Sequence, residues 1–229
     1  MKKLVILTGA GMSAESGIST FRDSGGLWEQ HNIEDVATPK AWHTNPDLVH
    51  RFYNERRKQL QTVKPNKGHE GLVELEKYFE VKIITQNVDN LHERAGSKWV
   101  LHLHGELMKM RSTSPEEEVF DVKPDKIEYH VGDLCPKAYP LRPHIVWFGE
   151  EVPNIQQATK IVQSADILVV IGTSLNVYPA AGLLNYARYN TPIYLIDPNE
   201  INIDTNRINY IKERATEGVA ILLEKLKQL

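Results

Sequence analysis

The sequence contains a single cysteine, Cys135, among 229 residues. One thiol cannot form an intrachain disulfide, which fits a reducing compartment. No apolar run is long enough to span a membrane, and the run after Met1, Lys2 and Lys3 is too short for a signal peptide. The formal net charge of −3 lacks the basic excess of nucleic-acid-binding proteins. We therefore expect a cytoplasmic protein whose main partners are neither membranes nor nucleic acids.

The composition is that of an ordinary globular protein, with 41% hydrophobic and 25% charged residues. The length suits one domain, or one domain that carries a smaller inserted module. Segments of helical character separate five short β-rich runs, at residues 4–7, 81–84, 98–103, 167–171 and 193–196. This alternation predicts a parallel sheet with crossover helices.

We therefore expect an α/β fold: a Rossmann-like parallel sheet with helices on both faces, plus a small inserted module that is helical and irregular. A helix is predicted at residues 48–60, after the start signal Asn45-Pro46-Asp47, and a closing helix at 219–226. Serine, acidic residues and prolines between residues 109 and 143 predict irregular, partly exposed structure. The single domain, residues 1–229, is predicted to divide into a large part, residues 1–30, 80–108 and 142–229, and a small module, residues 31–79 and 109–141.

A glycine turn, Gly9-Ala10-Gly11, follows the first predicted strand and opens a helix. Such a turn lets the backbone approach a pyrophosphate, whose charge the free N–H groups of the helix favour, although this motif alone is a weak signal. A dehydrogenase would continue into a second strand with an acidic residue about 20 residues later. Here residues 18–80 intervene before the next strand, which argues against hydride transfer. The loops after three strands, at residues 85–90, 172–177 and 197–200, are expected to outline one nucleotide-sized site with the turn.

Four separate motifs support a more specific interpretation. They are Gly-Ala-Gly-Met-Ser-Ala-Glu-Ser-Gly-Ile at 9–18 with Phe21-Arg22, Thr-Gln-Asn-Val-Asp at 85–89, His-Gly-Glu at 104–106, and Arg-Pro-His-Ile-Val-Trp-Phe-Gly-Glu at 142–150. Together they strongly resemble the sirtuin family, in the expected order and over nearly the whole chain. The resemblance implies an NAD-consuming protein-lysine deacylase: the acyl-lysine oxygen attacks the nicotinamide ribose, nicotinamide leaves, and O-acyl-ADP-ribose is released. It therefore implies an acyl transferase and not an oxidoreductase.

The same resemblance assigns site residues. His104 would be the general base that deprotonates a ribose hydroxyl, a task that suits an imidazole. His102, two residues earlier, is interpreted as structural. Phe21 and Arg22 resemble a mobile loop that closes over NAD and excludes water. The full NAD-binding set is Gly9, Ala10, Gly11, Ser13, Ala14, Glu15, Phe21, Arg22, Trp28, Gln86, Asn87, Asp89, Gly172, Thr173, Ser174, Asn199, Glu200 and Ala215. Without the family, the polar residues of this set would read equally well as ordinary turns and strand-end loops.

The acyl-lysine substrate is expected to add as a strand between two segments, Val146-Trp147-Phe148-Gly149-Glu150 and Asn176-Val177-Tyr178. Ala37, Tyr53 and Arg56 resemble the sirtuin subgroup that removes succinyl and malonyl groups. There the arginine and the tyrosine hydroxyl bind the distal carboxylate, and the small alanine leaves room for it. From spacing alone, Arg56-Arg57-Lys58 would be preferred as a charge run on a solvated helix surface.

The chain departs from the family in its cysteines. Sirtuins commonly hold a structural zinc between two Cys-x-x-Cys pairs, whereas only Cys135 remains here. One thiolate cannot make a four-coordinate site, so we predict no zinc and a small module that depends on packing of Tyr129, Leu134 and Tyr139. The prediction is thus a monomeric NAD-dependent deacylase of the zinc-less, desuccinylase-like subgroup, preferring succinyl- or malonyl-lysine over acetyl-lysine. The alternatives are a protein mono-ADP-ribosyltransferase and a non-catalytic module that binds NAD or ADP-ribose.

Overall fold

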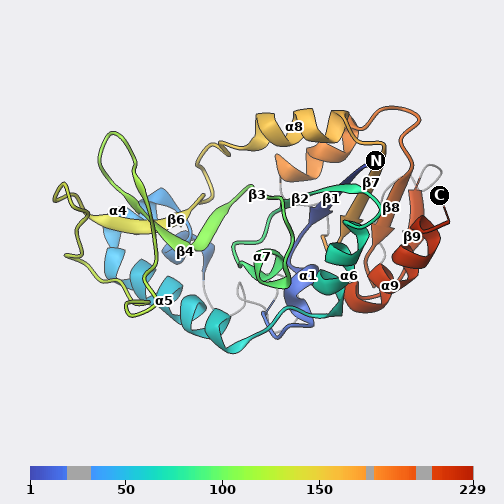
Figure 1. Ribbon diagram of the computed structural model, residues 1–229. Helices are drawn as coiled ribbons and strands as arrows, with labels where there is room; N and C mark the ends of the chain where they lie inside the picture. Colours follow the sequence, from blue (N-terminus) through green and yellow to red (C-terminus); the bar gives the residue numbers. More distant parts are fainter. Residues whose placement is uncertain (20–31, 174–177, 200–207, 229) are drawn as a thin grey trace.

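The computed structural model describes residues 1–19, 32–173, 178–199 and 208–228. Within these residues the strands form a six-stranded parallel sheet in the order β3-β2-β1-β7-β8-β9 and a three-stranded antiparallel sheet in the order β5-β4-β6 (Figure 1). The parallel sheet comprises β1 (Lys3–Thr8), β2 (Glu80–Thr85), β3 (Val100–His102), β7 (Ile167–Ile171), β8 (Ile193–Ile196) and β9 (Ile208–Ile211). The antiparallel sheet comprises β4 (Gly105–Ser112), β5 (Val119–Asp121) and β6 (Leu141–Ile145). The described helices are α1 (Gly11–Ala14), α3 (Ile33–Val36), α4 (Pro39–Thr44), α5 (Pro46–Thr62), α6 (Lys67–Leu75), α7 (Leu91–Ala95), α8 (Ile155–Gln163), the 3-10 helix η1 (Ala180–Tyr186) and α9 (Ala215–Leu226).

The parallel sheet confirms the predicted Rossmann-like α/β fold. Its five predicted strands are present, and β9 is an additional edge strand that the sequence did not predict. The chain first builds outward from β1 through β2 to β3, and later builds in the other direction from β7 to β9. The order therefore reverses between β1 and β7. In an open α/β sheet, ligands bind outside the carboxyl ends of the strands at this reversal.

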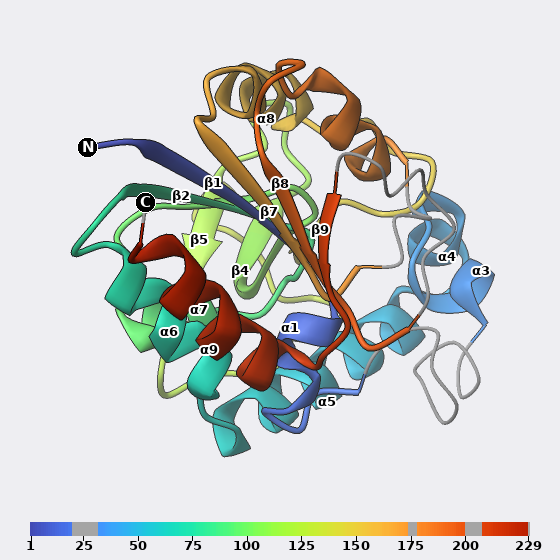
Figure 2. The ribbon, with the colours of Figure 1, turned by 90° about the vertical axis from the view of Figure 1, so that its right-hand side faces the viewer.

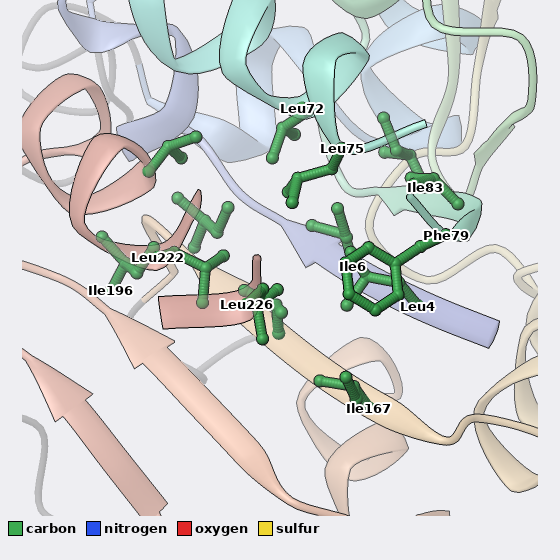
Figure 3. Close-up of a cluster of buried hydrophobic side chains, with 14 of the residues drawn as sticks. Leu4, Ile6, Leu72, Leu75, Phe79, Ile83, Ile167, Ile196, Leu222 and Leu226 are labelled. Carbon is green, nitrogen blue, oxygen red and sulfur yellow. The ribbon is translucent and has the colours of Figure 1, made fainter. Parts of the chain in front are cut away.

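Helices cover both faces of this sheet because its central strands are apolar along their whole length. The run of β7 is buried at all five positions. On one face Leu72 of α6 and Leu222 of α9 belong to a buried cluster that also includes Ile6 of β1 (Figure 3). On the other face α8 and η1 cover a second cluster that includes Val162 and Leu183. Helix α6, which the predicted division assigns to the small module, thus packs on the parallel sheet beside α9 (Figure 2).

The small module corrects one prediction. Residues 109–143 were expected to be irregular, but they include most of the antiparallel sheet β5-β4-β6. The strand β6 was hard to foresee because it contains Pro143, which pairs with Met110 of β4. Tyr129 lies in the core of this module as predicted, whereas Leu134 and Tyr139 are 52% and 42% exposed. They are exposed because they lie by the Leu134–Pro140 bridge that closes a surface loop.

Helix α5 connects the two parts of the molecule. It spans Pro46–Thr62 where residues 48–60 were predicted, and Asn45 caps it by accepting a hydrogen bond from the backbone N–H of Leu48 at 3.1 Å. Its buried face includes Tyr53 and Leu60, which pack with Trp147 in a third cluster. None of the helices in the described ranges is long and apolar enough to cross a membrane.

Candidate functional site

The glycine turn after β1 packs directly against the turn after β7. The N–H of Gly9 donates to the Ile171 carbonyl at 3.0 Å, and the N–H of Gly11 donates to the Gly172 carbonyl at 2.9 Å. A Cβ on Gly11 would lie 2.7 Å from Cα of Gly172, and Gly172 itself has a φ of +60°. Both positions therefore require glycine, which places bare backbone at the point where the strand order reverses.

The polar loop after β2 is hydrogen-bonded to this turn. The amide of Asn87 donates to the Gly9 carbonyl at 3.0 Å and to Oγ of Ser13 at 3.2 Å. Ser13 in turn donates to Oδ2 of Asp89 at 2.9 Å. Burial raises the pKa of the Asp89 carboxyl, which these hydrogen bonds partly oppose. Ser13 and two residues of a loop that is distant in the sequence, Asn87 and Asp89, thus form one buried polar group beside the glycine turn.

The loops after β7 and β8 complete this edge. Gln86 donates from Nε2 to Oγ1 of Thr173 at 3.1 Å, which ties the β2 loop to the β7 loop. The N–H of Asn199 donates to Oδ1 of Asp197 at 2.9 Å, just after β8. Because parallel strands end at one edge of the sheet, the described parts of the three predicted strand-end loops, residues 85–90, 172–173 and 197–199, lie along that edge.

His104 follows β3 and lies against the same loop. Its Nδ1 is 3.1 Å from the Gln86 carbonyl, which can only accept, so the proton is on Nδ1 and Nε2 carries a free lone pair. Burial lowers the pKa of His104, an effect that the hydrogen bond to Gln86 opposes. The ring is therefore neutral near pH 7, with a basic nitrogen held in a fixed orientation.

Gly105 makes this orientation possible. It has a φ of +81°, and a Cβ there would lie 2.1 Å from the His144 carbonyl oxygen. No other residue can occupy the position without displacing that strand. The carbonyl of His104 accepts from the N–H of Val146 at 2.9 Å, which joins the start of β4 to the segment after β6.

His102 has neither ring nitrogen free. Nδ1 is 2.9 Å from the Asn87 carbonyl, and Nε2 is 2.8 Å from Oε1 of Glu93 in α7. The side chain is buried at the end of β3. This geometry agrees with the interpretation of His102 as structural and leaves His104 as the candidate base.

The segment at residues 146–150 reaches the small module through two hydrogen bonds. Nε1 of Trp147 donates to the hydroxyl of Tyr53 at 3.0 Å, and the N–H of Phe148 donates to the Ala37 carbonyl at 3.0 Å. Ala37 and Tyr53 are both buried. Burial raises the pKa of Tyr53 above its usual range, so the hydroxyl stays neutral and keeps a proton to donate.

Arg56 lies one turn further along α5, and its side chain is only 19% exposed. Its Nε and Nη1 are buried and have no hydrogen-bond partner in the described ranges. Nη2 is 3.8 Å from the exposed carboxylate of Glu55, and the Phe52 ring centroid is 5.1 Å from the guanidinium carbon. Burial lowers the pKa of Arg56, and Glu55 offsets this only partly.

The charge-run interpretation of residues 56–58 is wrong, because two of the three side chains are not solvated. Arg57 is completely buried; it donates from Nε to the Leu107 carbonyl at 3.1 Å and from Nη1 to Asn54 at 2.6 Å. Lys58 alone is half-exposed, in an ion pair with Glu128.

Arg142, for which the sequence predicted no role, organises the segment at 146–150. It forms a bidentate ion pair with Glu150, with N–O distances of 2.7 and 3.1 Å, and lies over the Trp147 ring at 3.4 Å. Glu150 also accepts from the N–H of Trp147 at 2.7 Å. The carboxylate of Glu150, which we expected at the substrate, is thus used within the fold. The available signal was the Arg142-Pro143 pair at the start of the last motif.

Some of the remaining predicted site residues are described by the structure, and the others lie outside the described ranges. Glu15 accepts from the N–H and the hydroxyl of Thr216 at 2.9 and 2.7 Å, which joins α1 to the start of α9 beside Ala215. Gly149 has a φ of +90°, and Tyr178 is 75% exposed. Ala10 is the N-cap residue of α1, and Ala14 is its last residue. The predicted site residues outside the described ranges are Phe21, Arg22, Trp28, Ser174, Asn176, Val177 and Glu200.

Comparisons with known proteins agree with this geometry. The sequence model of the Sir2 family matches residues 9–179. An NAD-dependent protein deacylase of Bacteroides thetaiotaomicron is 57% identical over 233 residues, covering 100% of this chain and 98% of the relative. One of Helicobacter pylori is 51% identical, covering 100% and 97%.

Solved structures agree as well. A Sir2 homologue in complex with NAD is 39% identical with a TM-score of 0.88, covering 99% of this chain and 90% of that one. A Sir2 variant with a deacetylated peptide and 3'-O-acetyl ADP-ribose is 31% identical with a TM-score of 0.84, covering 97% and 92%. This chain therefore belongs to the Sir2 family of NAD-dependent protein deacylases.

Proposed function

We propose that this enzyme removes acidic acyl groups, succinyl and malonyl above all, from lysine side chains of proteins. The observation that carries the proposal is the guanidinium of Arg56, which is largely buried and has two nitrogens without partners in the described part of the chain. The carboxylate of Glu55, exposed and 3.8 Å from Nη2, offsets the cost of burying this charge only partly, so the guanidinium is suited to a ligand that brings further negative charge. The distal carboxylate of a succinyl or malonyl chain would supply it.

The surroundings of Arg56 fit the same ligand. Tyr53 is on the same face of α5, one turn earlier, and its hydroxyl accepts from Trp147, which leaves its proton for a carboxylate oxygen. The Trp147 to Tyr53 and Phe148 to Ala37 hydrogen bonds bring this face of α5 to the segment that we expect to pair with the peptide. A neutral acetyl group would leave Nε and Nη1 of Arg56 without partners, whereas an acidic chain forms charge-assisted hydrogen bonds with them.

The residues around the glycine turn fit NAD. Gly9, Gly11 and Gly172 expose backbone where a side chain would collide, and Asn87 and Asp89 add an amide and a carboxylate to the same edge. When bound, NAD supplies the ribose carbon that takes the acyl oxygen as nicotinamide departs. The polar loop at residues 86–89 would hold the nicotinamide ribose, and Thr173 and Asn199 would hold the adenosine half.

His104 is the proposed general base for a ribose hydroxyl. The Gln86 carbonyl holds the proton on Nδ1, and the lowered pKa keeps Nε2 unprotonated near pH 7. Since Gln86 belongs to the same loop as Asn87 and Asp89, the base and the proposed ribose site share one rigid support.

We also propose that the small module needs no zinc. Cys135 is buried there and accepts a hydrogen bond from Oγ of Ser112 at 3.4 Å, beside Met110 and Tyr129. In the described residues no group of three or more histidine, cysteine or acidic side chains is arranged to hold a metal. Activity that a zinc chelator abolishes and zinc restores would contradict this proposal.

Steady-state assays with acetyl- and succinyl-lysine peptides of one sequence test the acyl preference. We expect a higher kcat/KM for the succinyl peptide, with nicotinamide and O-succinyl-ADP-ribose as products. A higher kcat/KM for the acetyl peptide would refute the roles of Tyr53 and Arg56. Labelled NAD in the same reactions separates the alternative chemistry, because ADP-ribosyl transfer would leave label on a protein.

A further inference from the structure

His102 has hydrogen-bond acceptors on both sides. Its Nδ1 lies 2.9 Å from the Asn87 carbonyl and its Nε2 lies 2.8 Å from Oε1 of Glu93. A neutral imidazole carries one N–H, so it can donate to only one of these oxygens and would direct a lone pair at the other. Both contacts are satisfied together when the ring carries two protons and Glu93 is ionised.

We propose that His102 is a positioning residue that works as an imidazolium: paired with Glu93, it holds the Asn87 peptide and thereby sets the loop at residues 86–89 for NAD. The inference rests on the proposed placement of NAD against that loop. It concerns an ion pair to which the family assignment and the acyl preference give no role.

The anchoring of Asn87 shows why this carbonyl matters. The N–H of Asn87 donates to Oγ1 of Thr85 at 3.0 Å, and its side chain bonds to Gly9 and Ser13. The carbonyl contact with His102 is the remaining anchor of the peptide. The Gln86 carbonyl, which orients His104, belongs to the preceding residue, so a shift of the Asn87 peptide would move both the ribose site and the base.

The charges around His102 favour the protonated ring. Burial alone would lower the pKa of His102 and raise that of Glu93, but their mutual hydrogen bond reverses both shifts. On β4, Glu106 adds to the rise for His102, and Lys109 lowers the pKa of Glu93.

Asp89 and His92 also face the ring, from the loop and from α7, and the amide of Asn154, before α8, binds the His102 carbonyl at 2.8 Å. Because the pKa of His102 is raised above its usual value, the imidazolium persists to a higher pH in the folded chain than in the unfolded one, and it is lost as the pH rises through that raised value.

The variant Glu93→Gln removes the charge of the Glu93 side chain and keeps its size and shape. A glutamine amide can donate to Nε2 of a neutral ring, so Nδ1–H still donates to Asn87 without a second ring proton. We expect the Kd of wild-type enzyme for NAD to rise at least fivefold as the pH rises from 7 to 9.5, measured by calorimetry without peptide. In Glu93→Gln the Kd at pH 7 stays within about threefold of wild type and changes less than twofold over this range. Glu106→Gln is the matched control, because it removes a nearby carboxylate that does not contact His102, and should keep the alkaline loss.

The ring itself can be observed by NMR of enzyme labelled with ¹⁵N-histidine, with the His102 signals assigned by their absence in His102→Gln. Two protonated ring nitrogens at pH 7 are expected, and a neutral ring would overturn the inference. An equal alkaline loss in Glu93→Gln and wild type would also overturn it. If Asn87→Ala binds NAD as tightly as wild type while the His102 ring is doubly protonated, the proposed NAD placement is refuted. The inference about His102 is then refuted too, because it depends on that placement. A failed acyl preference is distinguishable, because these experiments contain no peptide.

Discussion

Arg56→Met is the sharpest perturbation of the proposed acyl site. Methionine keeps the apolar stem that packs beside Phe52 and removes the guanidinium. If the guanidinium forms two charge-assisted hydrogen bonds with a succinyl carboxylate, their loss should cost about 3 kcal/mol, or roughly 100-fold in kcat/KM for the succinyl peptide. The acetyl peptide has no carboxylate to lose, so its kcat/KM should change by less than about threefold.

The assay compares both peptides at saturating NAD in wild type, Arg56→Met and Arg51→Met. Arg51 is the control on the same helix, since its side chain is 62% exposed and its ion pair with Asp47, at 3.2 Å, is worth about 0–1 kcal/mol. It should leave both peptides unaffected. Thermal unfolding adds a second check: the guanidinium has two buried nitrogens without hydrogen-bond partners in the described residues and only the long ion pair with exposed Glu55, so its removal should not lower Tm. Equal losses on both peptides, or no loss on the succinyl peptide, would refute the assignment.

Three other predictions concern the base, its supporting glycine and acid stability. His104→Ala should lower kcat by at least about 100-fold while the Kd for NAD stays within about threefold; a loss of kcat under tenfold would be too small for a general base. Gly105→Ala should lower the free energy of unfolding by more than about 2 kcal/mol, because its Cβ would lie 2.1 Å from the His144 carbonyl. Gly132→Ala is the control, because Gly132 has a φ of +99° and a Cβ there would have no atom within 4 Å; it should lower the free energy of unfolding by about 1 kcal/mol. Equal losses for the two variants in denaturant titrations would contradict the steric argument. Burial lowers the pKa of His69 and of His50 to about 4, so only the unfolded chain takes up these protons between about pH 6.5 and 4. Stability in urea should fall by at least about 3 kcal/mol across that window, and a flat profile would refute the reasoning.

Whether a strand could be predicted from the sequence depended on how its residues are buried. β1 and β7 are covered on both faces, so they appear in the sequence as continuous apolar runs. β4 and β6 are buried on alternate positions and carry charged residues and Pro143, and these features resemble loops. Strand β9 lies at the sheet edge and has only Ile211 buried, so its four residues do not form an apolar run.

The residues of the candidate site also differ in whether the sequence could identify them. The glycine turn, His104 and the polar loop after β2 could be named from the sequence because each is a contiguous motif. The Trp147–Tyr53 hydrogen bond and the contact of Arg57 with the Leu107 carbonyl join residues that are distant in the chain, and no local pattern specifies them. Arg142 and Glu150 belong to one motif, but only the structure shows that they form an ion pair.

The sequence by itself determined the family and the α/β class and pointed to the proposed base, because short motifs and apolar runs carry that information locally. Only the tertiary structure decided which charged side chains stay solvated and which are buried. Arg56 and Arg57 are neighbours in one charge run, yet packing gives Arg57 a full set of partners and leaves two nitrogens of Arg56 without one in the described residues. That difference arises from burial, which depends on the elements packed around each side chain and not on the residues next to it in the chain.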